Sequence, residues 1–178
     1  MKQTVEIADG AAFSRTLRRL AHEILEHNPQ PEKLLMVGIL RRGAVLADLL
    51  AEEMEDICGV RPPCETLDIT LYRDDLTEAF PQPDVKQAAF SVRPEGRTVI
   101  LTDDVIYTGR TARAAMEAVI DMGRPSCIRL AVMVDRGHRE LPIRADYVGK
   151  NIPTSREELV QVLTVPYDGC QGIRLIKP

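Results

Sequence analysis

Two segments of the chain each combine a continuous apolar run with a turn and a helical pattern, and this repetition constrains the fold most. The first run covers residues 34–40 and leads into a helix predicted over residues 44–56. The second covers residues 98–102 and continues through a loop at 103–110 into a helix predicted over 111–122. Such runs are typical of strands buried on both faces of a parallel sheet, and their alternation with helices indicates an α/β fold. We therefore predict a central, mainly parallel sheet flanked by helices.

The other segments extend this pattern. We predict a first helix from the N-cap Asp9 to about Asn28, because apolar residues recur there at helical spacing. The long polar stretch at residues 72–96 is typical of a lid, a binding loop or a mobile hairpin. Further strands are predicted at residues 66–71, 127–134, 147–152, 159–163 and 173–176, the last as an edge strand in a tail that matches no pattern well.

Length and composition agree with one globular domain over residues 1–178, because 44% of the residues are hydrophobic. The apolar runs are too short to span a bilayer, and the N-terminus lacks the apolar centre of a secretory signal. We therefore expect a cytoplasmic protein without a membrane partner. A net charge of −4 argues against indiscriminate binding to nucleic acid, but it is compatible with a local basic surface.

The second strand–loop–helix unit carries a candidate ligand site. Asp103 and Asp104 directly follow the apolar run, where ligands bind in open α/β sheets. Thr108–Thr111 then opens the helix with hydroxyl groups, an arginine and a glycine, which suit a phosphate. Acids for sugar hydroxyls beside a phosphate loop indicate a sugar-phosphate pocket. A Mg²⁺ site for phosphoryl groups and a plain helix cap are the alternatives.

Segment Val99–Thr111 resembles the phosphoribosyl-diphosphate (PRPP) motif of the type I phosphoribosyltransferases. Nearly the whole chain resembles one subfamily of these enzymes, the pyrimidine operon attenuation regulators with uracil phosphoribosyltransferase activity. Residues 37–43, 67–76 and 134–155 carry that second resemblance. It implies the type I phosphoribosyltransferase fold, with a mobile loop at about 72–96 and a small hood formed mainly by about 135–178.

The resemblance implies that uracil and PRPP give UMP and diphosphate, with Mg²⁺ bound through PRPP and no direct protein ligand. Asp103, Asp104 and Arg42 would be the catalytic residues, the two acids holding the ribose hydroxyls and Arg42 the diphosphate. The PRPP and nucleotide site would comprise Arg41, Arg42, Arg73, Asp103, Asp104, Val105, Ile106, Tyr107, Thr108, Gly109, Arg110 and Thr111.

Residues 40–43 match the family's pyrophosphate loop, in which a non-proline peptide bond is often cis. The sequence departs here from the commoner Lys-Thr-Arg-Gly form, since Leu40 and Arg41 replace lysine and threonine. Arg41 either adds charge for a phosphate or points elsewhere, and an exposed turn is the alternative. Arg73 lies in the segment that resembles the mobile arm over PRPP, and beyond Leu76 a solvated hairpin is the alternative.

The base is expected beside residues 134–139, after the next strand. Val134, Arg136 and Val160 are the candidate uracil-binding residues. His138 is a candidate acid or base, although a loop histidine more often makes a hydrogen bond or faces an RNA.

The first helix carries a basic stripe, because Arg15, Arg18, Arg19 and His22 lie at positions i, i+3, i+4 and i+7. A solvated helix face is the alternative, but the segment from Arg15 to His22 contains almost no acid.

By the resemblance, this stripe joins Arg139, Arg144 and Lys150 in a surface that binds a hairpin in the leader of pyrimidine operon mRNA. UMP or UTP would favour binding of the RNA and PRPP would oppose it, and the subunits would form a homodimer or a higher homo-oligomer. Two alternatives are a salvage phosphoribosyltransferase without an RNA role and a regulator that has lost useful turnover.

Overall fold

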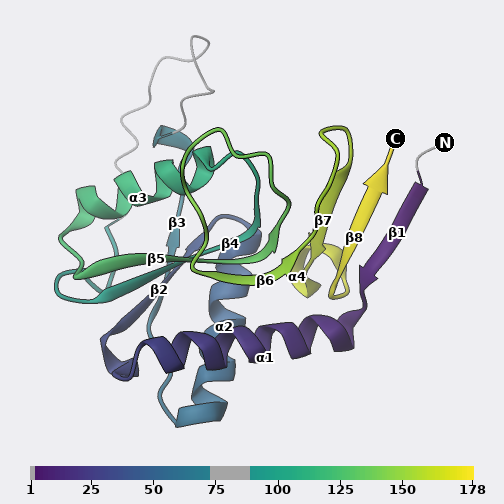
Figure 1. The fold of residues 1–178 in the computed structure, drawn as a ribbon. Coiled ribbons are helices and arrows are strands. Elements are labelled where there is room, and N and C mark those ends of the chain that lie inside the picture. Colours follow the sequence, from purple (N-terminus) through teal and green to yellow (C-terminus); the bar gives the residue numbers. More distant parts are fainter. Residues whose placement is uncertain (1–2, 73–88) are drawn as a thin grey trace.

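The part of the chain that the computed structural model describes, residues 3–72 and 89–178, forms a parallel sheet of five strands (Figure 1). Their spatial order is β3-β2-β4-β5-β6, and each neighbouring pair is parallel. The carboxyl ends of these strands therefore meet at one edge of the sheet. In chain order the strands are β2 (Leu34–Ile39), β3 (Cys64–Leu67), β4 (Thr98–Ile106), β5 (Cys127–Asp135) and β6 (Tyr147–Asn151).

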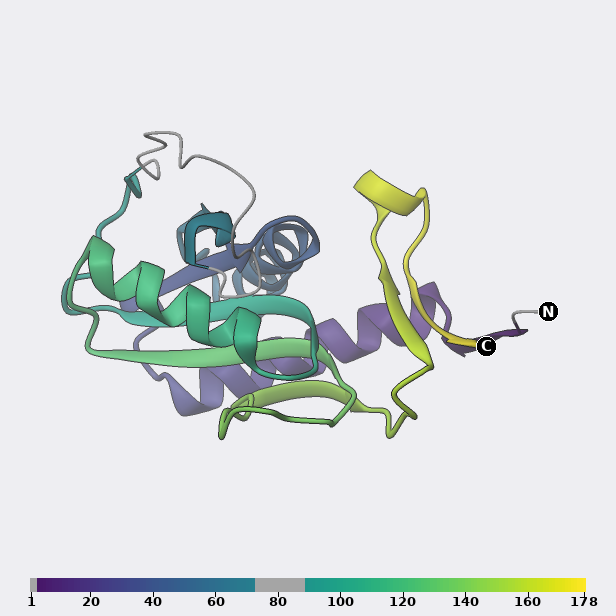
Figure 2. The same ribbon diagram turned by 90° about the horizontal axis from the view of Figure 1, so that it is seen from above.

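Helices cover both faces of this sheet (Figure 2). Met36 and Ile100 pack into the core beneath α1 and α2, whereas Leu35 and Val99 pack with α3 on the opposite face. Adjacent strand residues point to opposite faces, so a strand covered on both sides is apolar throughout. These contacts confirm the predicted parallel sheet with flanking helices. The helices are α1 (Gly10–His27), α2 (Arg42–Cys58) and α3 (Arg110–Met122).

The bounds predicted for α1 are confirmed. Asp9 is its N-cap, with a carboxylate oxygen that accepts a 2.8 Å hydrogen bond from the Ala12 N–H, and Asn28 is its C-cap. The apolar stripe faces the core. Its buried hydrophobic residues are Phe13, Leu17, Leu20, Ala21 and Ile24.

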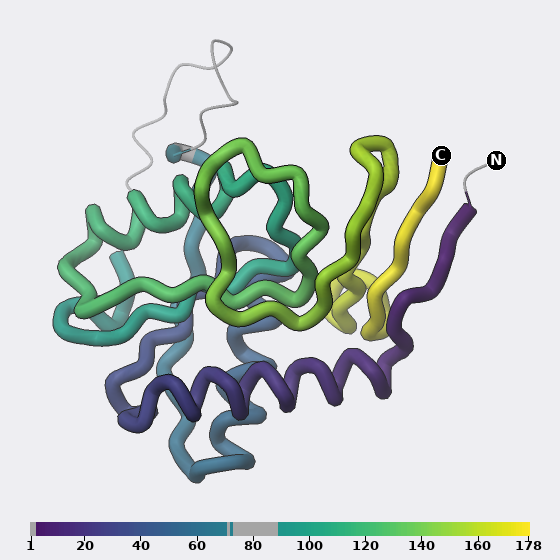
Figure 3. The backbone as a smooth tube through the Cα atoms, in the orientation of Figure 1, coloured from purple at the N-terminus to yellow at the C-terminus, as the bar shows by residue number. Residues whose placement is uncertain are grey.

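A smaller antiparallel sheet corrects the prediction for the tail. Its order in the described chain is β1-β8-β7, so β8 is the central strand and not an edge strand. β1 was not foreseen, and its pairing with β8 places the two ends of the chain side by side (Figure 3). The strands are β1 (Gln3–Ala8), β7 (Leu159–Leu163) and β8 (Gly172–Lys177), and the short helix α4 (Val165–Asp168) connects β7 to β8.

Predicted boundaries of β4, β3 and α2 were also wrong. β4 continues through Asp103 and Asp104 to Ile106, because its last residues still pair with β5. β3 ends at Leu67, where the Asp68 carboxylate accepts hydrogen bonds from the backbone and hydroxyl of Thr70 and turns the chain into a 3₁₀ helix. α2 begins two residues earlier than predicted.

Most of the predicted lid, including Arg73, lies outside the described residues. Among the residues that are described, no helix is both long and apolar enough to cross a membrane.

Candidate active site

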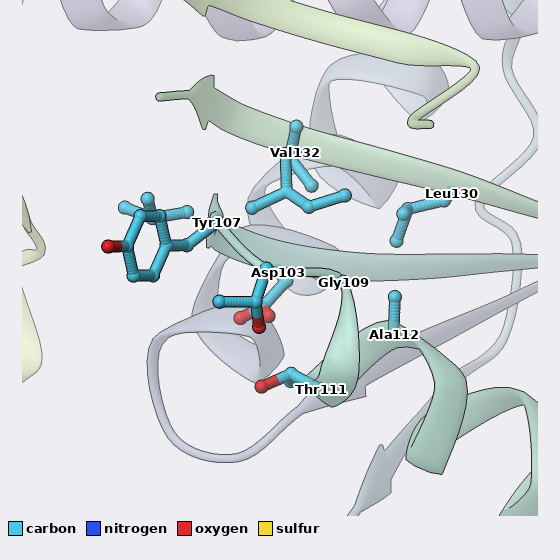
Figure 4. A pocket seen from close by; sticks show the side chains of 10 residues that line it. Asp103, Tyr107, Gly109, Thr111, Ala112, Leu130 and Val132 are labelled. Atoms are coloured by element: carbon cyan, nitrogen blue, oxygen red, sulfur yellow. The ribbon is translucent and has the colours of Figure 1, made fainter. Parts of the chain in front are cut away.

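A pocket of about 120 Å³ lies where β4 ends and α3 begins (Figure 4). Asp103, Gly109 and Thr111 line it from the β4–α3 unit, and Leu130 and Val132 line it from the neighbouring strand β5. Because both strands are parallel, the pocket lies at the carboxyl edge of the sheet, where the sequence predicted it.

The loop from β4 to α3 combines a glycine with a helix N-terminus. Gly109 is the N-cap of α3. Its φ of +93° is a backbone conformation that residues with a side chain rarely adopt. The helix therefore starts abruptly at Arg110, and its first backbone N–H groups face the loop without helical partners. The Thr108 hydroxyl adds a polar group by accepting a 3.3 Å hydrogen bond from the Arg110 N–H. This arrangement suits a phosphate group.

The two aspartates at the end of β4 differ in environment. Burial, followed by the negative charge of Asp104, raises the pKa of Asp103 well above its usual range. Asp103 accepts a 2.9 Å hydrogen bond from the Asp104 N–H, and Asp104 accepts a 2.8 Å bond from the Val105 N–H. Two adjacent carboxylates with few donors suit a ligand that brings hydroxyl groups or positive charge.

The loop after β2 packs tightly against the end of β4. A Cβ atom at Gly43 would lie 2.3 Å from the Thr102 carbonyl oxygen, so only glycine permits this approach. The peptide bond between Leu40 and Arg41 is cis, and both of these side chains are exposed. The predicted pyrophosphate loop and the predicted ribose site are therefore direct neighbours.

Arg42 extends from this loop toward the smaller sheet. Its guanidinium donates hydrogen bonds of 3.3 Å and 2.8 Å to the two carboxylate oxygens of Asp168 in α4. Sequence reasoning did not single out Asp168, because 126 residues separate the pair and no local motif marks the acid.

The candidate base-binding residues lie on both sides of the junction between the two sheets. Val134 and Val160 are buried in one hydrophobic core. Arg136 is only 6% exposed, and its guanidinium donates to the Thr154 hydroxyl and to the backbone carbonyls of Ser155 and Glu158. The sequence did not indicate the Thr154–Glu158 segment as a partner of Arg136.

His138 makes a hydrogen bond, which is the more common role of a loop histidine. Its Nε2 lies 2.5 Å from the Thr154 carbonyl oxygen. Its ring also stands edge-on to the Tyr107 ring, at 5.7 Å between centroids.

The basic stripe of α1 is exposed and lies beside β6. Arg15, Arg18, Arg19 and His22 are all exposed. The Arg19 guanidinium donates to the carbonyl oxygens of residues 148 and 149, so α1 and the half-buried Lys150 of β6 are brought together.

Arg139 and Arg144, which were also predicted to belong to the RNA surface, do not join the stripe of α1. The half-buried Arg139 bonds inward to the Asp135 carboxylate and to the carbonyls of Tyr107 and Ile143. Arg144 is exposed and lines a separate pocket beside α3. The structure therefore places only Lys150 next to the helical stripe.

Acids also reach the stripe from outside the segment that seemed to lack them. Glu53 of α2 pairs with Arg18 at 3.0 Å, and Glu23, one residue beyond the segment, pairs with Arg19 at 3.3 Å. These exposed pairs are weak, so they moderate the positive charge of the surface without removing it.

Comparison with known proteins agrees with this architecture. A model of the phosphoribosyl transferase domain matches residues 3–168, and the chain belongs to this family. Within the family, its relatives include proteins named Bifunctional protein PyrR. The one from Thermoanaerobacter sp. (strain X514) is 54% identical over 168 residues, which are 94% of each chain. The one from Pelotomaculum thermopropionicum is 51% identical over 176 residues, which are 99% of this chain and 97% of the relative.

Solved structures share the fold at low sequence identity. A hypoxanthine phosphoribosyltransferase from Trypanosoma cruzi, in a ternary substrates complex, matches with a TM-score of 0.75 and 18% identity over 97% of this chain and 95% of that one. A hypoxanthine phosphoribosyltransferase from Staphylococcus aureus matches with a TM-score of 0.67 and 20% identity, covering 88% of this chain and 80% of that one. These structures support the type I phosphoribosyltransferase fold.

Proposed function

We propose that this protein transfers a phosphoribosyl group from PRPP to uracil, giving UMP and diphosphate, and also regulates pyrimidine genes by binding leader mRNA. One observation carries the first activity. The Asp103 carboxylate near the end of β4 lines one pocket together with Gly109 and Thr111 at the start of α3, and a carboxylate beside a helix N-terminus is the pairing that a ribose 5-phosphate requires.

The reaction proposed for this site relies on position and charge. Asp103 and Asp104 accept hydrogen bonds from the ribose hydroxyls, and their negative charge stabilises the cationic sugar that develops as the bond at C1 breaks. Residues 105–111 surround the 5′-phosphate. Arg41 and Arg42 are proposed to bind the diphosphate that leaves, and the same role for Arg73, which lies outside the described residues, stays a prediction.

A magnesium ion fits this site as part of the substrate. Mg²⁺ usually keeps several waters and binds substrate phosphates, so PRPP itself can supply its ligands while Asp103 and Asp104 hold the ribose hydroxyls. Among the described residues, no group of three metal-binding side chains occurs. We propose that Mg²⁺ arrives bound to PRPP, where it neutralises the charge of the departing diphosphate.

Uracil is proposed to bind beside the carboxyl end of β5, near Val134, Arg136 and Val160. Backbone groups would then read most of the base, because the Arg136 guanidinium already holds residues 154–158.

The regulatory activity is proposed for the face formed by α1 and β6. Arg15, Arg18, Arg19 and His22 of α1 lie beside Lys150 of β6 on this face. Arg139, which bonds inward, and Arg144, which lines a pocket beside α3, are proposed as separate contacts to the RNA. Contacts with phosphates would supply affinity and unpaired loop bases would supply specificity. We propose that UMP or UTP in the nucleotide pocket favours binding of the RNA, that PRPP opposes it, and that a cytoplasmic homodimer or higher homo-oligomer is the active form.

Formation of UMP from uracil, PRPP and Mg²⁺ tests the enzymatic activity. Hypoxanthine and guanine serve as competing bases, because the solved structures of this fold include enzymes named for hypoxanthine. We expect turnover with uracil alone. Turnover only with a purine would replace this proposal with a purine salvage enzyme, and RNA binding without any turnover would leave a regulator alone.

A further inference from the structure

The connection between the smaller sheet and the predicted pyrophosphate loop is made by Asp168 and Arg42. Nε and Nη2 of Arg42 each donate a hydrogen bond to a different oxygen of the Asp168 carboxylate, at 3.3 Å and 2.8 Å. A two-point contact of this kind fixes the plane of the guanidinium as well as its position.

Asp168 is itself held in place. Its Oδ2 also accepts a 2.9 Å hydrogen bond from the Thr164 N–H, and its own N–H donates to the Thr164 carbonyl at 2.8 Å. Thr164 is completely buried. The Tyr167 ring flanks the same guanidinium, with its centroid 5.8 Å from the Arg42 central carbon. The carboxylate therefore belongs to a fixed turn between β7 and β8.

The contact leaves part of Arg42 available for a ligand. A guanidinium has five N–H donors in a rigid fork, and Asp168 takes one from Nε and one from Nη2. The remaining donors lie at the far end of the fork, on Nη1 and Nη2. The adjacent residue Gly43 packs against the backbone of Thr102 and Asp103, so Arg42 lies near the proposed ribose site.

An ordinary surface ion pair would not need this arrangement. Exposed pairs contribute little to stability, and the Arg42 side chain is 37% exposed. The Asp168 side chain is only 18% exposed, and the contact joins the smaller sheet to a loop at the candidate site. Its geometry therefore suits the orientation of a ligand-binding group better than the stabilisation of the fold.

We propose that Asp168 is a positioning residue that holds one edge of the Arg42 guanidinium so that its other end faces the diphosphate of PRPP. This inference rests on the proposed phosphoribosyltransferase activity. It assigns to α4 a part in binding substrate, although α4 itself contributes no group to the pocket.

A double-mutant cycle tests the proposal. Binding of PRPP with Mg²⁺ is measured by calorimetry for the wild type, Asp168→Ala, Arg42→Ala and the double variant. We expect Asp168→Ala to weaken binding about tenfold through loss of orientation. The double variant should bind no more weakly than Arg42→Ala, because Asp168 acts only through Arg42.

Two kinetic readouts separate positioning from a structural effect. Asp168→Ala should raise KM for PRPP while KM for uracil stays unchanged, and Asp168→Glu should recover part of the affinity. Glu55→Ala is the matched control, since it removes an acid from Arg61, an exposed arginine outside the site.

The outcomes that would overturn the proposal are distinct from failure of the proposed function. Wild-type affinity in Asp168→Ala, or a further loss when Asp168→Ala is added to Arg42→Ala, would overturn the positioning role. If Asp168→Ala loses its cooperative thermal transition, Asp168→Asn replaces it in the same cycle with the same expectations. A wild type that neither binds PRPP nor forms UMP would instead refute the phosphoribosyltransferase activity.

Discussion

The central carbon of the Arg136 guanidinium lies 4.2 Å from the centre of the Tyr107 ring. This contact joins the loop proposed to bind phosphate to the segment that leads into the smaller sheet, because the same guanidinium bonds to residues 154, 155 and 158. Arg136 is nearly inaccessible to solvent. One buried cation therefore sets the spacing between the phosphate loop and residues 154–158.

Replacing that cation should destabilise the protein. Arg136→Met removes the charged donor from the Thr154 hydroxyl and from the carbonyls of Ser155 and Glu158, and we expect the free energy of unfolding to fall by about 3 kcal/mol. Urea denaturation measures the change. Arg124→Met, at an exposed position, is the control. Equal losses in the two variants would show that Arg136 does not hold the junction.

Removing the Asp103 charge should stabilise the free protein while abolishing UMP formation. Its pKa is raised in the fold by burial and by Asp104, so the native state binds the proton more tightly than the unfolded chain does. Stability is therefore lost as pH rises through and above the ordinary carboxyl range. Asp103→Asn avoids that loss, and we expect a gain of about 1 kcal/mol, or roughly 2–4 °C in Tm, at pH 8.

The gain should shrink as the pH falls to the ordinary carboxyl pKa and disappear below it, since Asp103 is neutral in both states only there. Asp68→Asn provides a control of opposite sign, because hydrogen bonds from the Thr70 hydroxyl and backbone lower the pKa of Asp68. That substitution should lower Tm at neutral pH, with the difference fading in acid. Calorimetric scans between pH 4 and pH 8 compare them. A Tm gain for Asp103→Asn that does not vary with pH would contradict the electrostatic explanation.

A methyl group at Gly43 should disturb the contact between the loop after β2 and the end of β4. Its Cβ would meet the Thr102 carbonyl at 2.3 Å, and backbone must move to relieve that overlap. We expect Gly43→Ala to cost about 1–3 kcal/mol of stability and to weaken PRPP binding. Gly10→Ala is the matched control, because its Cβ would meet only a carbonyl at 3.6 Å. If urea denaturation gives the two variants equal stability, the close approach is not essential.

Arg15 offers a sharp test of the RNA surface. Within residues 3–72 and 89–178 its side chain makes no hydrogen bond or ion pair in the structure, so Arg15→Gln removes charge without breaking an internal contact. Affinity for a pyrimidine leader hairpin should fall. The slope of log affinity against log salt concentration should decrease by about one, because one fewer counterion is released. Arg61→Gln, paired with glutamates of α2, should not change it. Fluorescence anisotropy at several salt concentrations decides between these outcomes.

The parallel sheet and the strand–loop–helix unit that carries Asp103 could be predicted from sequence because their signals are local. The apolar run before Asp103 predicts a buried strand, and the glycine and threonines after it predict a helix opening. The end of β4 was misplaced because acids usually mark a loop, whereas pairing with β5 carries the strand on to Ile106.

Long-range contacts explain what the sequence did not reveal. β8 lies between β1 and β7 because the first and last strands of the chain pair with each other. No pattern within either segment predicts that pairing. The partner of Arg42 was missed for the same reason, since Asp168 lies 126 residues away. Such contacts depend on how the two sheets meet, which local periodicity does not encode.

The affinity of the wild-type protein for a pyrimidine leader hairpin, measured with and without UMP at one moderate salt concentration, tests most directly whether one chain joins both activities. We expect UMP to tighten RNA binding and PRPP to oppose that effect, because the nucleotide pocket and the basic face belong to the same molecule. RNA binding that ignores both ligands, or no binding of the hairpin at all, would contradict this account.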